Sequence, residues 1–448
     1  MLNIMMLLDS SDDSSDDEVR ENRQGQGPRE RQERLPSAET KWFKMIDSAA
    51  VHVPGSYWAK KFRRQFRVHI DRFLDLVETT KSWMRGDDGK PVFPRGSGRG
   101  DKKTIFVEIK VLMALRWLAR GETFDTIGDL SETSETAARV ACETWVHEFA
   151  LREWGAWVKV PEGEDLRREM EVFARMGLVG CGFSMDAVHL WYDACPAELN
   201  SLHVGKEGYP TRAFNVAVTH TKRIISSTVG HPGARNDKSI VRYDKFVQDV
   251  KEKKVLNVSY ELDTPDGGVV TEHGAYGIVD GGYHRWRCLQ AVEKNASEPQ
   301  AMHLSKWLES VRKDVECTFG IMKQRHRLLR SRLLLQDVGT IDDVFFSCAI
   351  LHNMLLEDDG WAARASNEAF WTNPQPVDAE LTMIPVVFDD DSEDDARPDV
   401  VPDRTFTRRV IPEVELEAER EDAYFALRDN IISTFARRWR ERRVQWLK

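Results

Sequence analysis

Apolar residues recur at every third or fourth position in three segments near the start of the chain. This spacing is typical of amphipathic helices, and it predicts helices over residues 57–66, 69–81 and 104–120. A stretch rich in glycine, proline and arginine, residues 86–101, predicts the loop between the second and third of these helices. The first part of the chain is therefore expected to be an all-helical unit.

Two shorter helical patterns follow, one over residues 123–130 and one from Ser134 to about residue 149. Ser134 is a preferred N-cap, and Glu135 lies at the positive end of the second helix. The pair resembles a helix-turn-helix, whose second helix would enter the DNA major groove with Glu135, Thr136 and Arg139 near its leading face. An ordinary helical hairpin explains the same pattern, so both alternatives stay open.

The middle of the chain changes to strand patterns. Apolar runs at residues 178–183 and 277–279 each lead into an aspartate, and each predicts a buried strand that ends there. Residues 211–219 alternate in character and, with residues 224–229, predict a β-hairpin. Strands mixed with helices in this order predict an α/β domain over residues 178–358.

Two segments between these strands are expected to form a helix and a loop. Asn236 and Asp237 are good capping residues, and they precede apolar positions that predict one helix over residues 240–250. Residues 251–275 are polar and glycine-rich, so we expect a variable loop there.

Two long helices are predicted in the last third of the chain. Apolar positions at helical spacing predict a helix over residues 304–329, from which Glu316 projects. Residues 413–447 predict one charged helix with an apolar face. We expect this face to dock within the chain, on the helical N-terminal domain, with pairing to a second chain as the alternative. The face consists of Phe425, Leu427, Ile431, Ile432, Phe435, Trp439 and Trp446.

Three acidic residues occupy positions where chemistry is expected. Asp186 and Asp280 each follow a predicted strand, so both should lie at the rim of the sheet, where open α/β sheets bind ligands. Glu316 would join them from its helix. Because mutual repulsion makes a bare cluster of acids costly, a divalent cation would stabilise it. Mg²⁺ prefers oxygen ligands, and two ions about 4 Å apart promote in-line phosphoryl displacement. The triad thus predicts nuclease or strand-transfer chemistry.

The frames around these acids resemble the PIF/Harbinger-type transposases and transposase-derived nucleases of the DDE superfamily, especially their plant and protist branch. The resemblance covers roughly residues 40–360, and it departs from the family pattern at Ala187, His284 and Cys317 without replacing a carboxylate. The frames are Met185-Asp186-Ala187-Val188-His189, Val279-Asp280-Gly281-Gly282-Tyr283 and Arg312-Lys313-Asp314-Val315-Glu316-Cys317-Thr318-Phe319-Gly320, with family-like segments at 195–196, 205–211 and 232–238 between the first two.

The resemblance implies a fold, an activity and partners. The implied fold is an RNase H-like mixed sheet with flanking helices. The implied activity is cleavage of DNA phosphodiester bonds by an Asp-Asp-Glu triad of Asp186, Asp280 and Glu316, with two Mg²⁺ or Mn²⁺ ions. The implied partners are double-stranded DNA and a separate Myb-like DNA-binding protein, and the implied location is the nucleus.

Basic residues surround the predicted triad. Residues 312–332 carry seven bases against two acids, and this cluster would meet backbone phosphates beside the metal. Pairing of Arg312 with Glu316 four residues later explains one base but not the cluster. The candidate DNA contacts on this segment are Arg312, Lys323 and Arg327. Lys206 and Arg212 are weaker candidates for phosphate contact, and Asp237 and His189 are candidates for supporting roles; a structural role is favoured for His189, which should face the other side of its strand.

The distribution of charge reconciles DNA binding with an acidic chain. The net charge is −10, but residues 1–18 contain six acids and no base, and residues 389–399 contain seven acids and one arginine. Each stretch contributes −6, so the remainder carries about +2, which does not exclude DNA binding. Such acidic stretches are typical of solvated tails.

The remaining composition predicts a soluble protein of a reducing compartment. The six cysteines show no CxxC spacing, so neither a zinc site nor a disulfide framework is indicated. The apolar residues 2–8 lack a basic flank, so we expect no signal peptide and no membrane span. The expected organisation is a disordered acidic tail over 1–38, a helical domain over 39–160, the nuclease domain over 178–358, an acidic linker over 361–410 and a C-terminal helix over 411–448.

Two other functions stay open from the sequence. A domesticated DNA-binding protein that no longer cleaves would keep the same fold, although the complete triad argues against it. An interaction scaffold would act through the acidic tails and the C-terminal helix. A homo-oligomer is also open.

Overall fold

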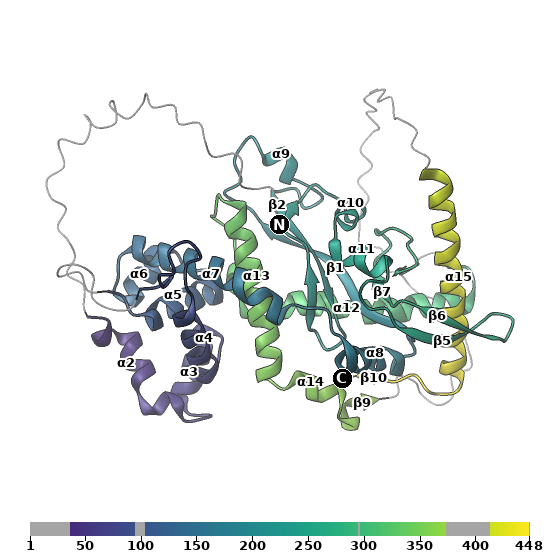
Figure 1. Cartoon of the computed structure of the whole chain (residues 1–448), viewed down its shortest axis with the longest axis horizontal. Coiled ribbons are helices and arrows are strands. Elements are labelled where there is room, and N and C mark those ends of the chain that lie inside the picture. The colour runs from purple at the N-terminus through teal and green to yellow at the C-terminus, as the bar shows by residue number, and fades with distance from the viewer. Residues whose placement is uncertain (1–35, 95–103, 294–295, 373–412, 448) are drawn as a thin grey trace.

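The structure is a computed structural model in which the helical part and the mixed α/β part lie side by side (Figure 1). Most of the expected acidic tail and of the expected linker lie outside the residues that it describes. The described residues are 36–94, 104–293, 296–372 and 413–447.

The N-terminal part is helical, as the apolar spacing predicts. The three helices expected from that spacing form within three residues of their predicted bounds, as α3, α4 and α5. The helices of this part are α2 (Lys41–Asp47), α3 (Tyr57–Phe66), α4 (Ile70–Ser82), α5 (Val107–Arg120), α6 (Phe124–Ser131) and α7 (Glu135–Trp157), with short 3₁₀ turns at Ser37–Glu39 and Ala49–His52. The next helix, α8 (Gly163–Arg175), belongs to the α/β part, because it packs against β1.

The helical pair α6 and α7 forms where it was expected, but α7 is longer. Ser134 caps α7, because its side chain accepts a hydrogen bond from the backbone N–H of Ala137 at 3.3 Å. The helix continues to Trp157 because its buried side, which includes Trp145 and Phe149, packs against α5 and the later helix α13 (Val338–Asp358). α7 therefore connects the helical part to the α/β part.

The cap at Ser134 gives a first testable prediction. Ser134→Ala is expected to lower the free energy of unfolding by about 1 kcal/mol, because it removes the side-chain acceptor for an N–H in the first turn. Urea unfolding followed by circular dichroism would measure the change. Ser134→Asp keeps an acceptor and should match the wild type, so equal losses in both variants would contradict the capping role.

A mixed six-stranded sheet forms the centre of the α/β part. Its order is β3-β2-β1-β7-β8, with β4 paired to β2. β1 is antiparallel to β2 and parallel to β7, and β7 is parallel to β8. The strands are β1 (Cys181–Trp191), β2 (Thr211–Val218), β3 (Ile224–Ser227), β4 (His231–Pro232), β7 (Tyr276–Val279) and β8 (Leu289–Ala291). The prediction of a mixed α/β domain is confirmed at this level.

Helices cover both faces of the sheet. On one face, Val188 and Leu190 of β1 pack in the core with Val315 of α12 (Pro299–Arg325). On the other face, Phe183 and Met185 pack with residues of two short helices and of α8. The short helices are α10 (Asp237–Arg242) and α11 (Lys245–Lys251); a further turn of helix, α9 (Asn200–His203), lies between β1 and β2. Because side chains alternate along a strand, Asp186 lies on the α12 face with Val188.

Three local predictions are corrected by the structure. Asp186 lies in the middle of β1 rather than at the end of a strand, because the apolar alternation continues through Val188 and Leu190. The single helix expected near residue 240 is two helices, because Asp244 caps a second one by accepting from the N–H groups of Phe246 and Val247. The expected loop over residues 251–275 contains a β-hairpin. Its strands are β5 (Ser259–Asp263) and β6 (Val269–His273).

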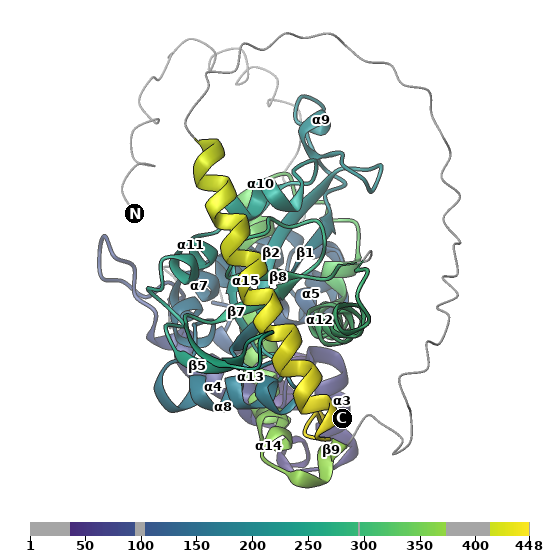
Figure 2. The same cartoon turned by 90° about the vertical axis from the view of Figure 1, so that its right-hand side faces the viewer.

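The C-terminal segment docks on the α/β part, not on the helical N-terminal domain. Figure 2 shows α15 (Glu413–Arg440) crossing this part of the molecule from end to end. Leu427, Ile431 and Phe435 are buried with Trp307 of α12. The helix ends at Arg440, before the predicted bound, and β10 (Trp446–Leu447) pairs with β9 (Trp371–Thr372). Phe425, which was expected on the docking face, is 38% exposed.

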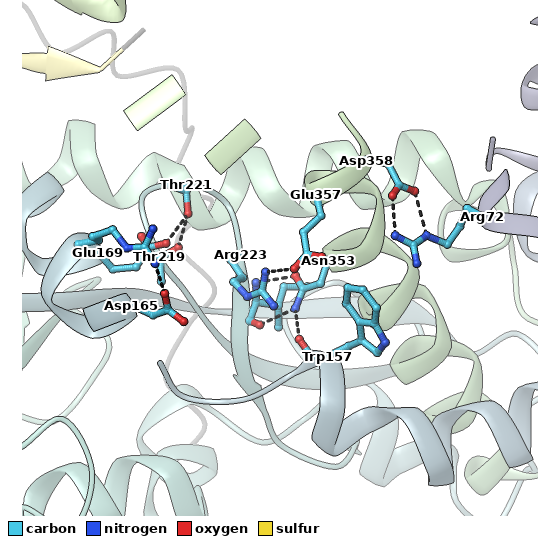
Figure 3. A network of polar contacts seen from close by, with 12 residues as sticks. Arg72, Trp157, Asp165, Glu169, Thr219, Thr221, Arg223, Asn353, Glu357 and Asp358 are labelled. Atoms are coloured by element: carbon cyan, nitrogen blue, oxygen red, sulfur yellow. Dashed lines mark hydrogen bonds and ion pairs between the residues drawn. The ribbon is translucent and has the colours of Figure 1, made fainter. Parts of the chain in front are cut away.

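Asn353 on α13 joins the sheet to the helical part through a polar network (Figure 3). Its amide oxygen accepts from the N–H of Ile224 at 3.0 Å, and its amide nitrogen donates to the carbonyls of Ile224 and Trp157, both at 2.8 Å. Nearby, α14 (Trp361–Ala365) and a 3₁₀ turn at Glu368–Phe370 lead to β9. A cavity of about 770 Å³ opens here, with Trp157 and Glu169 among its lining residues.

A membrane span requires both a minimum length and a high hydropathy, and none of the described helices meets both requirements.

Candidate functional site

The strand register places Asp186 and Asp280 side by side. In the parallel pair of β1 and β7, Ser184 is opposite Ile278. Two residues further along are Asp186, within β1, and Asp280, the residue directly after β7. Since positions two apart along a strand share a face, continuing this alternation places both on the face that α12 covers. Neighbouring strands lie about 4.8 Å apart, so the two carboxylates are close neighbours.

Arg312 connects Glu316 to this pair. α12 crosses the sheet face, and Nη1 of Arg312 lies 2.8 Å from Oδ2 of Asp186. Nη2 of the same guanidinium donates to Oε1 of Glu316 at 2.6 Å. The third acid of the predicted triad therefore reaches the first through a cation from its own helix.

A fourth carboxylate, Asp237, lies beside Asp280. Asp237 is the first residue of α10, and a Cβ built on Gly282 would lie 3.3 Å from its Oδ2 and 2.9 Å from Oδ1 of Asp280. The N–H of Gly282 also donates to Oδ1 of Asp280 at 2.7 Å. The absence of a side chain at Gly282 thus allows two acids to approach each other. Asp237 was expected from the sequence to have a supporting role, and its position beside Asp280 depends on the turn at Gly282.

The pKa values of the site are those expected of clustered carboxylates whose negative charges are only partly neutralised. Burial raises the pKa of Asp186 to about 6, and the nearby charges of Asp280 and Asp237 add to the rise. The N–H of Ala187 and the guanidinium of Arg312 act in the opposite direction. Burial and the charge of Asp280 also raise the pKa of Asp237. A cation placed among these carboxylates would therefore stabilise them.

The side chains of the cluster offer the type of donor atom that a hard divalent ion prefers. Asp186, Asp280, Asp237 and Glu316 all offer carboxylate oxygens, which Mg²⁺ and Mn²⁺ prefer. However, across the described part of the chain no three His, Cys, Asp or Glu side chains form a group already arranged to hold a metal. On this face the guanidinium of Arg312 lies between Asp186 and Glu316 and binds both. The side chain of Glu316 is 46% exposed, so its carboxylate has room to turn toward the two aspartates.

The position of Arg312 leads to a prediction on metal affinity. Arg312→Gln is expected to lower the half-saturating Mg²⁺ concentration about tenfold, because Asp186 and Glu316 lose a competing cation. A tenfold change corresponds to about 1.4 kcal/mol. Isothermal titration of the DNA-free protein would measure it, with Arg223→Gln, which changes an ion pair to Glu357 away from the site, as the control. Unchanged or weaker Mg²⁺ binding by Arg312→Gln would contradict the competition.

The segment that contains these carboxylates also matches a family of known proteins. Residues 155–363, slightly less than half of the chain, match the model of a plant transposon protein family. The matched segment includes Asp186, Asp237, Asp280 and Glu316. This match supports a relationship to transposases. No curated protein and no solved structure matches it.

The other basic candidates occupy different environments. Nζ of Lys323 donates to the carbonyl of His189 at 3.2 Å, so it ties α12 to β1. Arg212 donates two hydrogen bonds to Asp342, at 2.9 and 2.8 Å, so its guanidinium is occupied within the fold. Lys206 is exposed, and so is Arg327, which begins the 3₁₀ turn Arg327–Arg330 after α12.

His189 lies on the face opposite Asp186. Its Nδ1 is 2.9 Å from Oγ1 of Thr211, and burial together with the charge of Lys206 lowers its pKa. Asp314, two residues before Glu316, is buried and contacts His220 and Lys222. Neither His189 nor Asp314 joins the carboxylate cluster.

The three residues of the helix-turn-helix prediction share the exposed start of α7. Glu135, Thr136 and Arg139 are all exposed, Arg139 pairs with Glu135 at 3.2 Å, and its guanidinium lies 4.8 Å from the ring centre of Phe124. They come from the helical part and do not contact the carboxylate cluster. Their position suits a separate contact with DNA and equally suits a stable helical hairpin.

Proposed function

We propose that this transposase-related protein is a metal-dependent DNA endonuclease or transposase of the PIF/Harbinger type. The observation that carries the proposal is the parallel register of β1 and β7, which sets Asp186 beside Asp280 on the face crossed by the Glu316 helix. The sheet order supports it, since an antiparallel β3-β2-β1 unit followed by parallel strands is the arrangement expected of an RNase H-like domain.

In the proposed site the carboxylates hold the metal and the bases hold the DNA. Asp186 and Asp280 would bind two Mg²⁺ or Mn²⁺ ions, with Glu316 completing the site after it leaves Arg312. Such ions activate a water or hydroxyl and stabilise the leaving oxygen of an in-line phosphoryl displacement. Once the acids bind the metal, Arg312 would be free to bind a phosphate of double-stranded DNA in their place. A nuclear location and a Myb-like partner protein belong to the same proposal.

The direct experiment is cleavage by the purified protein. Supercoiled plasmid and short duplexes would be incubated with Mg²⁺ or Mn²⁺, with EDTA as the control. Nicked or linear product that depends on metal would support the proposal. No product with either ion, over a range in which the protein binds the same DNA, would overturn it.

One observation favours a second candidate, a DNA-binding protein that does not cleave. Arg312 neutralises both Asp186 and Glu316, and the carboxylates of the described residues form no ready metal group. If the protein binds DNA equally well with Mg²⁺ or EDTA and leaves it uncut, this candidate replaces the first. A scaffold that acts through the C-terminal helix is disfavoured, because the apolar side of α15 is buried within the chain.

A further inference from the structure

Three arginines from three separate elements meet at the junction of the helical part and the α/β part. Arg67 follows α3 in the left-handed conformation, with φ of 65°, Arg120 is the last residue of α5, and Arg327 follows α12. Nη2 of Arg120 donates to the carbonyl of Arg64 at 3.0 Å, which joins the ends of α3 and α5.

Gly121 brings the end of α5 against the turn that begins at Arg327. Its φ is +66°, and a Cβ at this position would lie 2.9 Å from Oγ of Ser331 and 3.3 Å from Cα of Leu328. Any other residue would hold these two segments apart. Arg120 and Arg327 are therefore neighbours because a glycine directly follows α5. Arg67, which follows α3, lies close enough for its charge to act on Arg120.

None of these three arginines forms an ion pair among the described residues, although Glu122, which pairs with Arg116, lies close enough to act on Arg120. Arg325, by contrast, pairs with Asp359. Nε of Arg67 and Nε of Arg120 are buried and have no hydrogen-bond partner within the described structure. Burial lowers the pKa of both residues, and the charge of Arg327 lowers that of Arg67 further. For Arg120 the charges of Arg116, Arg67 and Arg327 add to the lowering, and the charge of Glu122 opposes it. Like charges held this close are costly unless an anion joins them.

Helix capping explains only part of this arrangement. Arginine at a helix C-terminus stabilises the last carbonyls, and the bond from Arg120 to the carbonyl of Arg64 is such a contact. That contact uses one N–H of one arginine. It leaves the Nε groups and the whole of the exposed Arg327 unexplained.

We propose that Arg67, Arg120 and Arg327 form a binding site for a backbone phosphate of the DNA that enters the carboxylate cluster. This inference rests on the proposed function for its ligand. Glu316 lies nine residues before the end of α12 at Arg325, about 14 Å along a helix at 1.5 Å per residue, and Arg327 follows two residues after that end. At 3.4 Å per base pair, the phosphate would lie roughly five base pairs from the bond at the metal site. The site joins the N-terminal helices to the same DNA segment as the triad.

The test is DNA binding in EDTA, which does not depend on cleavage. Affinity for two duplexes of unrelated sequence would be measured over a series of salt concentrations. Arg67→Gln, Arg120→Gln and Arg327→Gln are each expected to reduce the slope of log K against log salt by about 1, and to weaken binding about fivefold at 0.15 M salt on both duplexes. Arg116→Gln, on the same helix as Arg120 but paired with Glu122, is the matched control and should keep the wild-type slope.

Two further arms separate the possible outcomes. Arg327 is exposed, so its variant is expected to fold, and Arg120→Lys keeps the charge and should retain most of the slope. Wild-type slopes in all three glutamine variants would overturn the phosphate site. A second outcome would also overturn it: inorganic phosphate raises the melting temperature of the wild type but not of the three variants, while the salt slopes of DNA binding stay unchanged. The arginines would then bind a free anion rather than DNA. If the variants lose DNA binding but the triad variants cut as well as wild type, the phosphate site stands and the proposed function fails.

Discussion

Asp186→Asn and Asp280→Asn are each expected to reduce metal-dependent DNA cleavage by at least about 10³-fold. The reason is that an amide lacks the charge with which each carboxylate would hold the ions, and charge stabilisation by a bound metal is worth several kcal/mol of the barrier. Each factor of ten in rate corresponds to about 1.4 kcal/mol. Cleavage of supercoiled plasmid under single-turnover conditions would measure the loss.

Glu316→Gln should show the same direction of change, because Glu316 is the third ligand in the proposal. Asp193→Asn is a suitable control, since this exposed acid lies 3.9 Å from Arg332 and takes no part in the cluster. DNA binding in EDTA should persist in all four variants. Cleavage at the wild-type rate by any one of the three triad variants would remove that residue from the catalytic role.

The substitution Asp186→Asn is also expected to make the metal-free protein more stable. Burial and nearby acids raise the pKa of Asp186 from 3.8 to about 6, so the folded protein holds a proton that the unfolded chain has released between these pH values. The stability of the wild type should therefore fall as pH rises from about 4 to about 6, and then stay level. Since one pKa unit corresponds to about 1.4 kcal/mol, the penalty above pH 6 is at most about 3 kcal/mol.

Asparagine at position 186 removes this penalty but also loses the ion pair with Arg312. The expected net gain is about 1–2 kcal/mol at pH 7 in EDTA, shrinking toward pH 4. Urea unfolding at a series of pH values would measure it. Asp314→Asn is the informative contrast, because it removes a buried acid that contacts His220 and Lys222 and should destabilise the protein. If Asp186→Asn were less stable than the wild type at pH 7, the ionised carboxylate would stabilise the metal-free fold, and the expected penalty would be contradicted.

Some features of the fold follow from local sequence alone. The helices α3, α4 and α5 formed where apolar spacing placed them, because each buries one side against the same core. The hairpin of β2 and β3 also formed as predicted. In these segments the periodicity of the chain and its burial agree, so no distant contact was needed to predict them.

Other features depend on contacts that the sequence does not reveal. Tyr260 and Leu262 make residues 259–263 a strand, although the surrounding stretch is polar enough to suggest a loop. The docking face of α15 was visible as an apolar stripe, but its partner, Trp307 of α12, was not. Arg212 resembled a free base, yet Asp342, 130 residues later in the chain, holds its guanidinium.

The candidate site shows the same division. The sequence identified Asp186, Asp280 and Glu316 from their frames, and the predicted pairing of Arg312 with Glu316 is present. It did not show that the same guanidinium reaches Asp186, because that contact depends on how α12 crosses the sheet. Nor did it show Asp237 beside Asp280, which depends on the missing side chain at Gly282.

The docking of α15 has a consequence for how the protein is made. α12 carries Arg312 and Glu316 and buries Leu304, Trp307 and Leu308 in the same core as α15. A ribosome completes α12 at Arg325, 115 residues before it reaches the end of α15 at Arg440. Until then the apolar side of α12 that faces α15 stays uncovered in the nascent chain. The contacts of the Glu316 helix with α15 can therefore form only after residues 413–440 have been synthesised, whereas its contacts with the sheet, through Val315 and Phe319, need no later segment.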